Sequence, residues 1–289
     1  MAIKSILCLV DGGEDSEAVL LSALSMGRRM GAYVEVLHVE LDPKYAVPLA
    51  ADGMTATMIE EVVDTVERES SKRVKRAEQV VNEVADREKL RLVEPGQSEP
   101  GEFAIAFRRE RGREHDVVAR RGMAFDLIVL TRRHGEGEPP ATPTLETALM
   151  ESGRPVLVAP AGEHHDAGDH VCIAWRASVP GVHALQASLA LLTAAKQVTV
   201  ITVDDGASGD ASPEEIAGYL RHHGIEAKAR HVSARGSDAG EAIMAEASEA
   251  GADLLVMGAY AHSRLRQFIM GGVTSTVLRS AAIPLLLAH

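Results

Sequence analysis

Near the end of the chain, small residues are spaced in a way that could hold a phosphate group. Gly258 and the pair Gly271-Gly272 bracket a loop, and Thr274-Ser275 follow where a helix is expected to open. Glycines let a backbone approach a polyphosphate closely, and the hydroxyl and free N–H groups at a helix start supply donors in a favourable dipole. The alternative is that Gly271-Gly272 only turns the chain into the helix, and the pair alone does not decide between the two.

The residues that follow the first apolar run of each half differ in charge. Asp11 follows Ile6–Val10 near the start, whereas Arg176 follows Ala174-Trp175 in the second half. Because ligands of parallel sheets collect beyond the carboxyl ends of the strands, Asp11 and Arg176 are both candidate site residues. Trp175, the only tryptophan, is expected to be core or pocket wall rather than a surface on which a ligand stacks.

The first half has no equivalent of the glycine-rich loop. Its corresponding segment, Thr131–Pro140, carries two glutamates and two prolines. Glutamate side chains would repel phosphate, and proline removes backbone N–H donors. The sequence therefore places an acidic group without a phosphate loop in the first half, and a phosphate loop without the acidic group in the second.

Histidine is abundant, which raises the question of a metal site. The chain has 12 His, including those in His164-His165-Asp166, Asp169-His170 and His222-His223. Imidazole and carboxylate suit zinc or nickel, but adjacent histidines on a linker seldom converge on one ion, so solvated polar residues are the favoured interpretation. A catalytic pair in His262-Ser263 is disfavoured because consecutive side chains point apart and no orienting carboxylate is evident. No catalytic or metal-binding residue is predicted.

An internal repeat provides the elements that position these residues. Three apolar runs of the first half recur in the second in the same order: Ile6–Val10 with Val171–Trp175, Asp126–Leu130 with Asp253–Met257, and Pro155–Ala159 with Pro284–Ala288. The interval from Asp to Pro is 29 residues in the first copy and 31 in the second. Matching runs at nearly equal spacing argue against chance similarity.

Each repeat is expected to be an α/β domain with a parallel sheet. Short all-apolar runs alternate with amphipathic helical segments, which is typical of βαβ units covered on both faces. In the second copy we predict strands at Val171–Trp175, Val198–Val203, Ile225–Val232, Asp253–Met257 and Pro284–Ala288, and helices at Gly181–Ala195, Pro213–Gly224, Asp238–Ala250 and Thr274–Ser280. Two five-stranded domains are predicted, residues 1–161 and 169–289, divided by the polar segment Ala161–Asp169.

The first copy is longer than the second, and the extra length lies mainly in Thr55–Leu90. Valine and isoleucine recur there at helical spacing among many charged residues. This pattern predicts a long amphipathic helix on the surface. A partner-docking arm is the alternative interpretation.

The composition excludes several classes of partner. A net charge of −12 and only 3% aromatic residues disfavour binding to nucleic acid, which needs clustered cations or stacking rings, although a single nucleotide needs only a local positive site. No segment reaches the roughly 18 consecutive apolar residues of a membrane helix, and the N-terminus is expected to be a core strand rather than a secretion signal. Cys8 and Cys172 are predicted to be buried and free. We expect a soluble, cytoplasmic protein.

The segment from Gly258 to Thr274 resembles the signature of the universal stress protein family. Nucleotide-binding members carry a glycine, two residues, a glycine, nine residues, and then a glycine with a serine or threonine. Gly258 matches the first position, Ala261 replaces the second glycine, and Gly271 matches the third. Gly272 stands where Ser or Thr is usual, while Thr274 falls on a later hydroxyl position that also faces phosphate. Because the repeat covers essentially the whole chain, it resembles the tandem branch of the family.

The resemblance implies a Rossmann-like fold of the adenine nucleotide α-hydrolase type and an ATP site, with Mg²⁺, in the second domain. Asp11 looks like the family's acidic residue near adenosine. In the second domain the implied contacts are, for the adenine side, Ala174, Trp175 and the backbone of Val203, and for the phosphates, Gly271, Gly272, Val273 and Thr274. Arg176 would either offer charge to a phosphate or occupy the ligand's space.

The resemblance also implies a regulatory role in the stress response, with at most a slow ATPase activity. The alternative is a scaffold of the same fold that has lost its ligand. The last strands, Val156–Ala159 and Leu285–Ala288, would pair antiparallel and make the chain an internal pseudo-dimer. Further homodimerisation is compatible with this arrangement, and neither nucleic acid nor membrane is expected as a partner.

Overall fold

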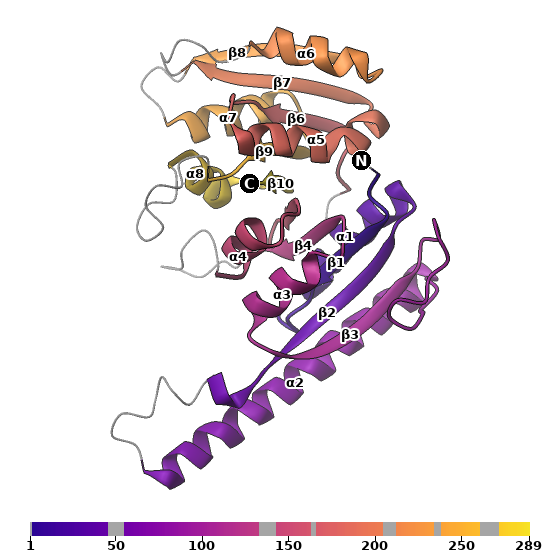
Figure 1. Ribbon diagram of the computed structural model, residues 1–289, viewed down its shortest axis with the longest axis vertical. Helices are drawn as coiled ribbons and strands as arrows, with labels where there is room; N and C mark the ends of the chain where they lie inside the picture. The colour runs from indigo at the N-terminus through magenta and orange to yellow at the C-terminus, as the bar shows by residue number, and fades with distance from the viewer. Residues whose placement is uncertain are drawn as a thin grey trace.

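The apolar runs of both repeats join one ten-stranded sheet, with strand order β3-β2-β1-β4-β5-β10-β9-β6-β7-β8 (Figure 1). The computed structural model describes residues 2–45, 55–132, 143–162, 166–204, 212–233, 238–260 and 272–289. Neighbouring strands within each half are parallel, and helices connect them. The predicted α/β class, with five parallel strands from each repeat, is confirmed.

The first half contributes the strands β1 (Ser5–Leu9), β2 (Tyr33–Leu41), β3 (Ile105–Gly112), β4 (Leu127–Thr131) and β5 (Val156–Ala159). Its helices are α1 (Ser16–Met30), α2 (Ala56–Glu88), α3 (Glu114–Gly122) and α4 (Pro143–Glu151), with a short 3-10 turn, η1 (Pro43–Tyr45). The β1 residues Ile6, Leu7 and Cys8 are fully buried because the strand lies inside the sheet with helices on either side.

The second half contributes the strands β6 (His170–Ala174), β7 (Gln197–Asp204), β8 (Ala227–Ser233), β9 (Leu254–Gly258) and β10 (Leu285–Ala288). Its helices are α5 (Val179–Ala194), α6 (Pro213–His222), α7 (Ala239–Glu249) and α8 (Gly272–Ser280). Every predicted element of this half is present, and most ends lie within two residues of the prediction. One difference matters for the site, because α8 begins at Gly272 rather than at Thr274.

The two halves meet where β5 and β10 pair antiparallel. Leu286 lies opposite Leu157, and Leu285 lies opposite Val158. These side chains are essentially inaccessible to solvent. The junction therefore continues the backbone ladder from one repeat to the other and leaves neither strand as an exposed edge.

Helices cover both faces of this sheet and divide the core into two layers. One layer packs α1, α2, α5 and α6 against the sheet, through residues such as Leu20, Val81, Leu185 and Leu220. The other packs α3, α4, α7 and α8, through Val117, Leu145, Ile243 and Leu278. Apolar residues recur along each helix at helical spacing, so they form one face, and that face packs against the sheet.

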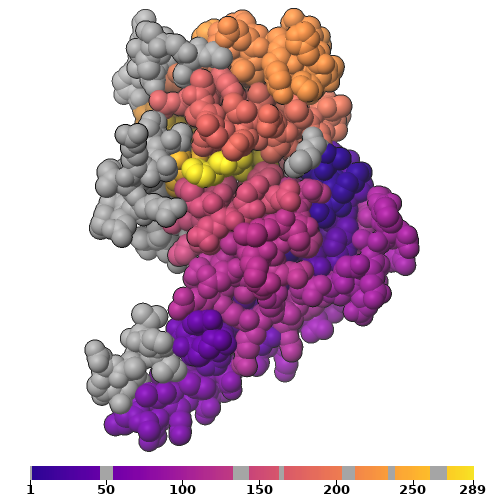
Figure 2. Space-filling view, in the orientation of Figure 1, coloured from indigo at the N-terminus to yellow at the C-terminus, as the bar shows by residue number. Residues whose placement is uncertain are grey.

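The longest helix, α2, has 33 residues and an expected length of about 50 Å. Its buried residues begin only at Val74, and Met58 near its start is 47% exposed. Figures 1 and 2 show the first half of α2 projecting beyond the sheet as an arm. The predicted long surface helix is confirmed, and the role of the projecting half as a docking arm stays a hypothesis.

Both cysteines are buried and unpaired, as predicted. Burial raises the pKa of the Cys172 thiol to about 12, and it raises the pKa of Cys8 further still. The packing of these thiols, rather than any reactivity, therefore explains their places in β1 and β6.

Candidate functional site

The predicted adenine-side residues lie at the carboxyl end of β6. Ala174 pairs with Ile201 on β7 and with Met257 on β9. The N–H of Trp175 donates to the carbonyl oxygen of Ile201 at 2.8 Å, and its side chain is 7% exposed within the core layer under α5. Trp175 is therefore part of the core, one of the two places expected for it, whereas the next residue, Arg176, is exposed.

Val203, the other predicted adenine-side residue, lies near the end of β7 and is half-buried. It pairs with Val232 on β8, the strand on the other side of β7 from β6. Its backbone is at the correct edge of the sheet for a ligand that lies across β6 and β7.

Gly258 is crowded by the chain itself. A Cβ atom at this position would lie 2.5 Å from the backbone nitrogen of Gly181 and 2.6 Å from the carbonyl carbon of Pro180. The absence of a side chain thus lets the start of α5 pack directly on the end of β9. The space gained at Gly258 is used by the start of α5, which differs from the close approach to phosphate inferred from the sequence.

Besides Gly258, the structure describes the end of the predicted phosphate loop, at the first turn of α8. Gly272 is exposed and Val273 half-buried, while Thr274 and Ser275 are 5% and 7% exposed. The N–H groups of a first helical turn have no partner within the helix and can face a ligand. Ala261 and Gly271, the other predicted residues of this loop, lie outside the described residues.

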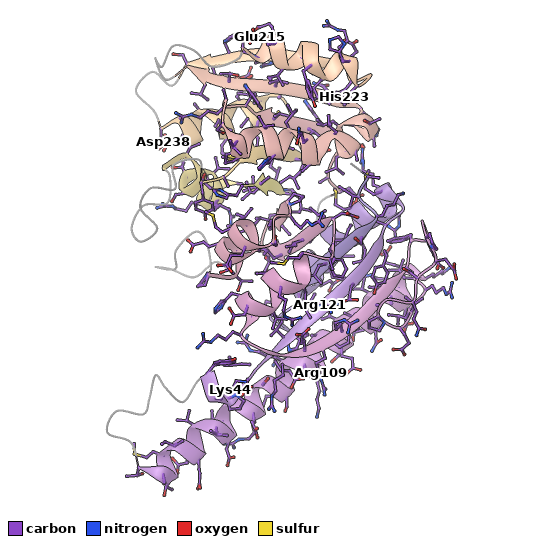
Figure 3. The ribbon with its side chains drawn as sticks, viewed as in Figure 1. Lys44, Arg109, Arg121, Glu215, His223 and Asp238 are labelled. Carbon is purple, nitrogen blue, oxygen red and sulfur yellow. The ribbon has the colours of Figure 1, made fainter. Side chains whose placement is uncertain are left out.

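A carboxylate that the sequence analysis missed lies beside this turn. Asp238 precedes α7, and its Oδ1 accepts a hydrogen bond from the N–H of Gly240 at 2.7 Å. Its Oδ2 lies 3.8 Å from the position that a Cβ atom on Gly272 would take. Figure 3 shows Asp238 at this corner of the second half. The backbone of α8 suits a phosphate, but this charge does not.

In the first half, Asp11 is engaged in holding its own turn. Its Oδ1 accepts from the N–H of Gly13 at 2.8 Å and from the hydroxyl of Ser16 at 3.3 Å. Arg73 on α2 approaches its Oδ2 at 4.0 Å. Asp11 therefore links the β1–α1 turn to α2, whatever it does toward a ligand.

A small pocket opens beside Asp11. Its lining consists of Leu9, Asp11, Val19, Glu114, Leu130, Thr131 and Thr144. The hydroxyl of Thr144 donates to Oε1 of Glu114 at 2.7 Å. Two carboxylates make this pocket unsuited to phosphate. Glu114 was not singled out from the sequence, because an acidic residue in a first helical turn is ordinary. The two glutamates of Thr131–Pro140 lie outside the described residues.

Residues 177–289 match the Universal stress protein family. The family match thus covers most of the second half of the chain. The whole chain is similar in fold to a universal stress protein from Archaeoglobus fulgidus DSM 4304, with a TM-score of 0.68 and 18% identity over 98% of this chain and 95% of that chain. A putative universal stress protein from Pseudomonas aeruginosa UCBPP-PA14 has a TM-score of 0.57 and 15% identity, with 99% and 93% of the two chains covered.

These TM-scores over nearly the whole chain establish a shared fold across both halves, and the family resemblance expected from the sequence is confirmed. No curated protein sequence matches the chain. Within the described residues, no helix combines the length and the apolar character that crossing a membrane requires.

One arginine links the first half to α8, the helix whose first turn belongs to the candidate site. Arg132, just after β4, is 8% exposed. Its guanidinium donates to the carbonyl oxygens of Leu278 and Ala281, the latter at 3.0 Å, at the end of α8. Burial lowers the pKa of Arg132. The cation lies at the negative end of the α8 dipole, where it is stabilising.

The most buried charge of the molecule's described part lies away from the carboxyl ends of the strands. Glu35, 2% exposed and the third residue of β2, contacts Arg108 on β3 at 2.7 Å and also contacts Arg121 on α3. The hydroxyl of Tyr33 donates to Oε2 of Glu35 at 3.0 Å, and burial raises the pKa of Tyr33 to about 12. This cluster ties the edge strand to its covering helix and is separate from the candidate site.

Proposed function

We propose that the chain is a nucleotide-binding regulatory protein of the stress response that acts in the cytoplasm. ATP with Mg²⁺ is its ligand, held by the second half. Two observations support this proposal: the family match of residues 177–289, and the start of α8 at the carboxyl edge of β9, where Gly272 is exposed. The second carries the proposal, because free N–H groups at a helix start are a ready site for phosphate.

In this proposal the adenine lies across the ends of β6 and β7, near Ala174, Trp175 and the backbone of Val203. The phosphates lie at the N–H groups of the α8 start, with the Thr274 hydroxyl nearby. The proposed phosphate-side residues are Ala261, Gly271, Gly272, Val273 and Thr274. Arg176 is exposed at the mouth of this site, where its charge would face a phosphate.

We further propose that residues 1–161 and 169–289 are two domains arranged as an internal pseudo-dimer. The antiparallel contact of β5 with β10 supports this arrangement. A further homodimer of the whole chain would then use surfaces other than these two strands.

The test is calorimetry with ATP and Mg²⁺ on the wild type and two variants of one position. Val273→Pro removes a backbone donor, and proline is tolerated in a first helical turn. Val273→Ala keeps that donor. We expect Val273→Ala to bind as the wild type does and Val273→Pro to bind about tenfold more weakly, the usual size of a hydrogen bond to a charged group. Equal binding by both variants would place the phosphates elsewhere.

A ligand-free interaction scaffold is the second candidate function. Asp238 beside α8 and the filled space at Gly258 favour it, and the projecting half of α2 would be its contact surface. Mass spectrometry of small molecules released on denaturing the purified protein separates the two. Absence of any adenine nucleotide, together with no heat on adding ATP and Mg²⁺, would leave the scaffold as the function.

A further inference from the structure

Helix α5 carries no charged residue, although one of its sides lies on the surface. Its sequence from Val179 to Ala194 contains no Asp, Glu, Lys or Arg, whereas every other helix that the structure describes contains at least one. Figures 1 and 2 show α5 on the face of the second half that is turned to the viewer. Helices that are apolar all round are usually buried all round. The solvent side of α5 is thus unusual in a chain whose net charge is −12.

The outer face of α5 is bulky at the start of the helix and small at its end. Val179 and Val182 in the first turn are 67% and 41% exposed. Ala190 is half-buried and Ala194 is exposed. The spacings of three, eight and four residues put these four side chains on one face, because three and four residues are close to a helical turn. The opposite face, including Leu185 and Leu192, is packed in the core.

The polar residues on the outer face leave one amide available at the middle of the helix. Nδ1 of His183 donates to the carbonyl oxygen of His289 at 2.8 Å, and the hydroxyl of Thr193 donates to the carbonyl oxygen of Leu189 at 2.8 Å. Gln186, in contrast, is exposed. An amide side chain both donates and accepts hydrogen bonds. A second copy of Gln186 would therefore be a matching partner for it.

A surface that binds its own copy about a two-fold axis has to be complementary to itself. Patches of a single sign of charge fail this condition, and copies of a protein with net charge −12 repel each other in general. The outer face of α5 meets the condition. When two such helices run antiparallel with their midpoints together, Val179 faces the partner's Ala194 at each end, and the two Gln186 side chains lie on either side of the axis.

We propose that two copies of the chain associate through an antiparallel contact between their α5 helices. The bulky start of each α5 packs on the small end of the other, and the two Gln186 amides pair near the axis. The proposal goes beyond the nucleotide-binding function and does not depend on it, because none of the residues proposed to contact the nucleotide belongs to α5.

The size of this contact predicts a weak dimer. With 16 residues, α5 is about 24 Å long and about 10 Å wide. Such an area is far below the roughly 800 Å² per partner of a stable interface and is typical of transient association. We therefore expect a Kd on the order of 100 µM.

Sedimentation equilibrium of the wild type, Val182→Glu and Met123→Glu without nucleotide tests the contact. Val182→Glu places a charge inside it, and we expect the dimer to weaken at least about tenfold. Met123, 51% exposed on α3 at the opposite face of the sheet, is the matched control, and Met123→Glu should change the Kd less than about twofold. Raising NaCl from about 50 to about 500 mM should strengthen the wild-type dimer, because salt screens the repulsion between the two copies.

A wild type that stays monomeric at about 1 mM, ten times the expected Kd, overturns the proposal. So does Val182→Glu that associates as strongly as the wild type, with circular dichroism showing that both are folded. Weaker association of the wild type at high salt would mean that ion pairs on another surface hold the dimer, and it also overturns the proposal.

Disulfide trapping tests the orientation of the two helices. Cysteines at equivalent positions of two copies form a disulfide only when their Cα atoms come within about 7 Å. Cys8 and Cys172 are buried, so an introduced surface cysteine is the one that oxidised glutathione reaches. We expect Gln186→Cys to form a covalent dimer at least about tenfold faster than the control Met123→Cys. Equal rates for the two variants overturn the antiparallel contact.

Discussion

At the scale of single residues, Gly258 is explained by its contact with α5. Replacing it with alanine places a Cβ atom 2.5 Å from backbone, which cannot move as a side chain can. We expect Gly258→Ala to lower the free energy of unfolding by about 1–3 kcal/mol, the usual cost of overpacking. Gly218→Ala in α6 is the control, because nothing lies within 4 Å of its Cβ position and alanine favours helix. Urea unfolding measures both, and equal stability of the two variants would contradict this account.

The burial of Cys8 and Cys172 predicts that both thiols react slowly in the folded protein. The pKa of Cys172 is raised to about 12 and that of Cys8 is raised further, so almost no thiolate exists at pH 8. A thiol-specific chromogenic reagent should react slowly with the native protein. After denaturation it should react readily with both cysteines.

The raised pKa values of the two thiols also lower the stability of the fold at high pH. Unfolded thiols lose protons near their ordinary pKa while buried ones do not, so this contribution to stability is present below about pH 8.5 and declines above it.

The residue types at the candidate site were readable from the sequence, but their neighbours were not. Gly258 and Thr274 were found by spacing, and Trp175 was correctly expected to be core. Asp238 was recognised only as the start of a helix. It lies 34 positions before Gly272 in the sequence, and only the packing of α7 on α8 brings the two together.

At the scale of elements, the link from Arg132 to α8 predicts a loss of stability when the guanidinium is removed. Arg132→Met fills similar space but leaves the buried carbonyls of Leu278 and Ala281 without this donor. We expect a loss of about 2–4 kcal/mol in the free energy of unfolding, since hydrogen bonds to a charged group are among the stronger ones. Arg132→Lys keeps the charge but not the forked geometry of the guanidinium. Its free energy of unfolding should therefore lie between those of the wild type and Arg132→Met. A denaturant midpoint for Arg132→Met equal to that of the wild type would show that α8 does not need this contact.

Element positions were predicted well because the period of apolar residues differs between strand and helix. The helix expected at Pro213–Gly224 begins at Pro213, behind Ser212, whose side chain and that of Glu215 satisfy each other's backbone N–H groups. The sequence predicts the start of α8 at Thr274, two residues after the observed start at Gly272, because glycine is a poor helix former. Arg132 gave no signal, since its partners are backbone carbonyls of the other repeat.

At the scale of the whole molecule, the continuous sheet predicts that the two halves unfold together. Trp175, the only tryptophan, lies in the second half. Gly12 lies in the first half with φ +75°, and a Cβ atom there would lie 2.3 Å from the carbonyl oxygen of Arg73. Gly12→Ala should therefore destabilise the first half by more than about 1 kcal/mol. If β5 and β10 couple the halves, the thermal unfolding transitions seen by Trp175 fluorescence and by circular dichroism both move to lower temperature, by about 2–4 °C for each kcal/mol.

Gly218→Ala, in the second half, checks that Trp175 fluorescence responds to a local change. An unmoved Trp175 transition in Gly12→Ala would mean that the halves unfold independently, so that the antiparallel pairing joins two separate cores without making them one cooperative unit.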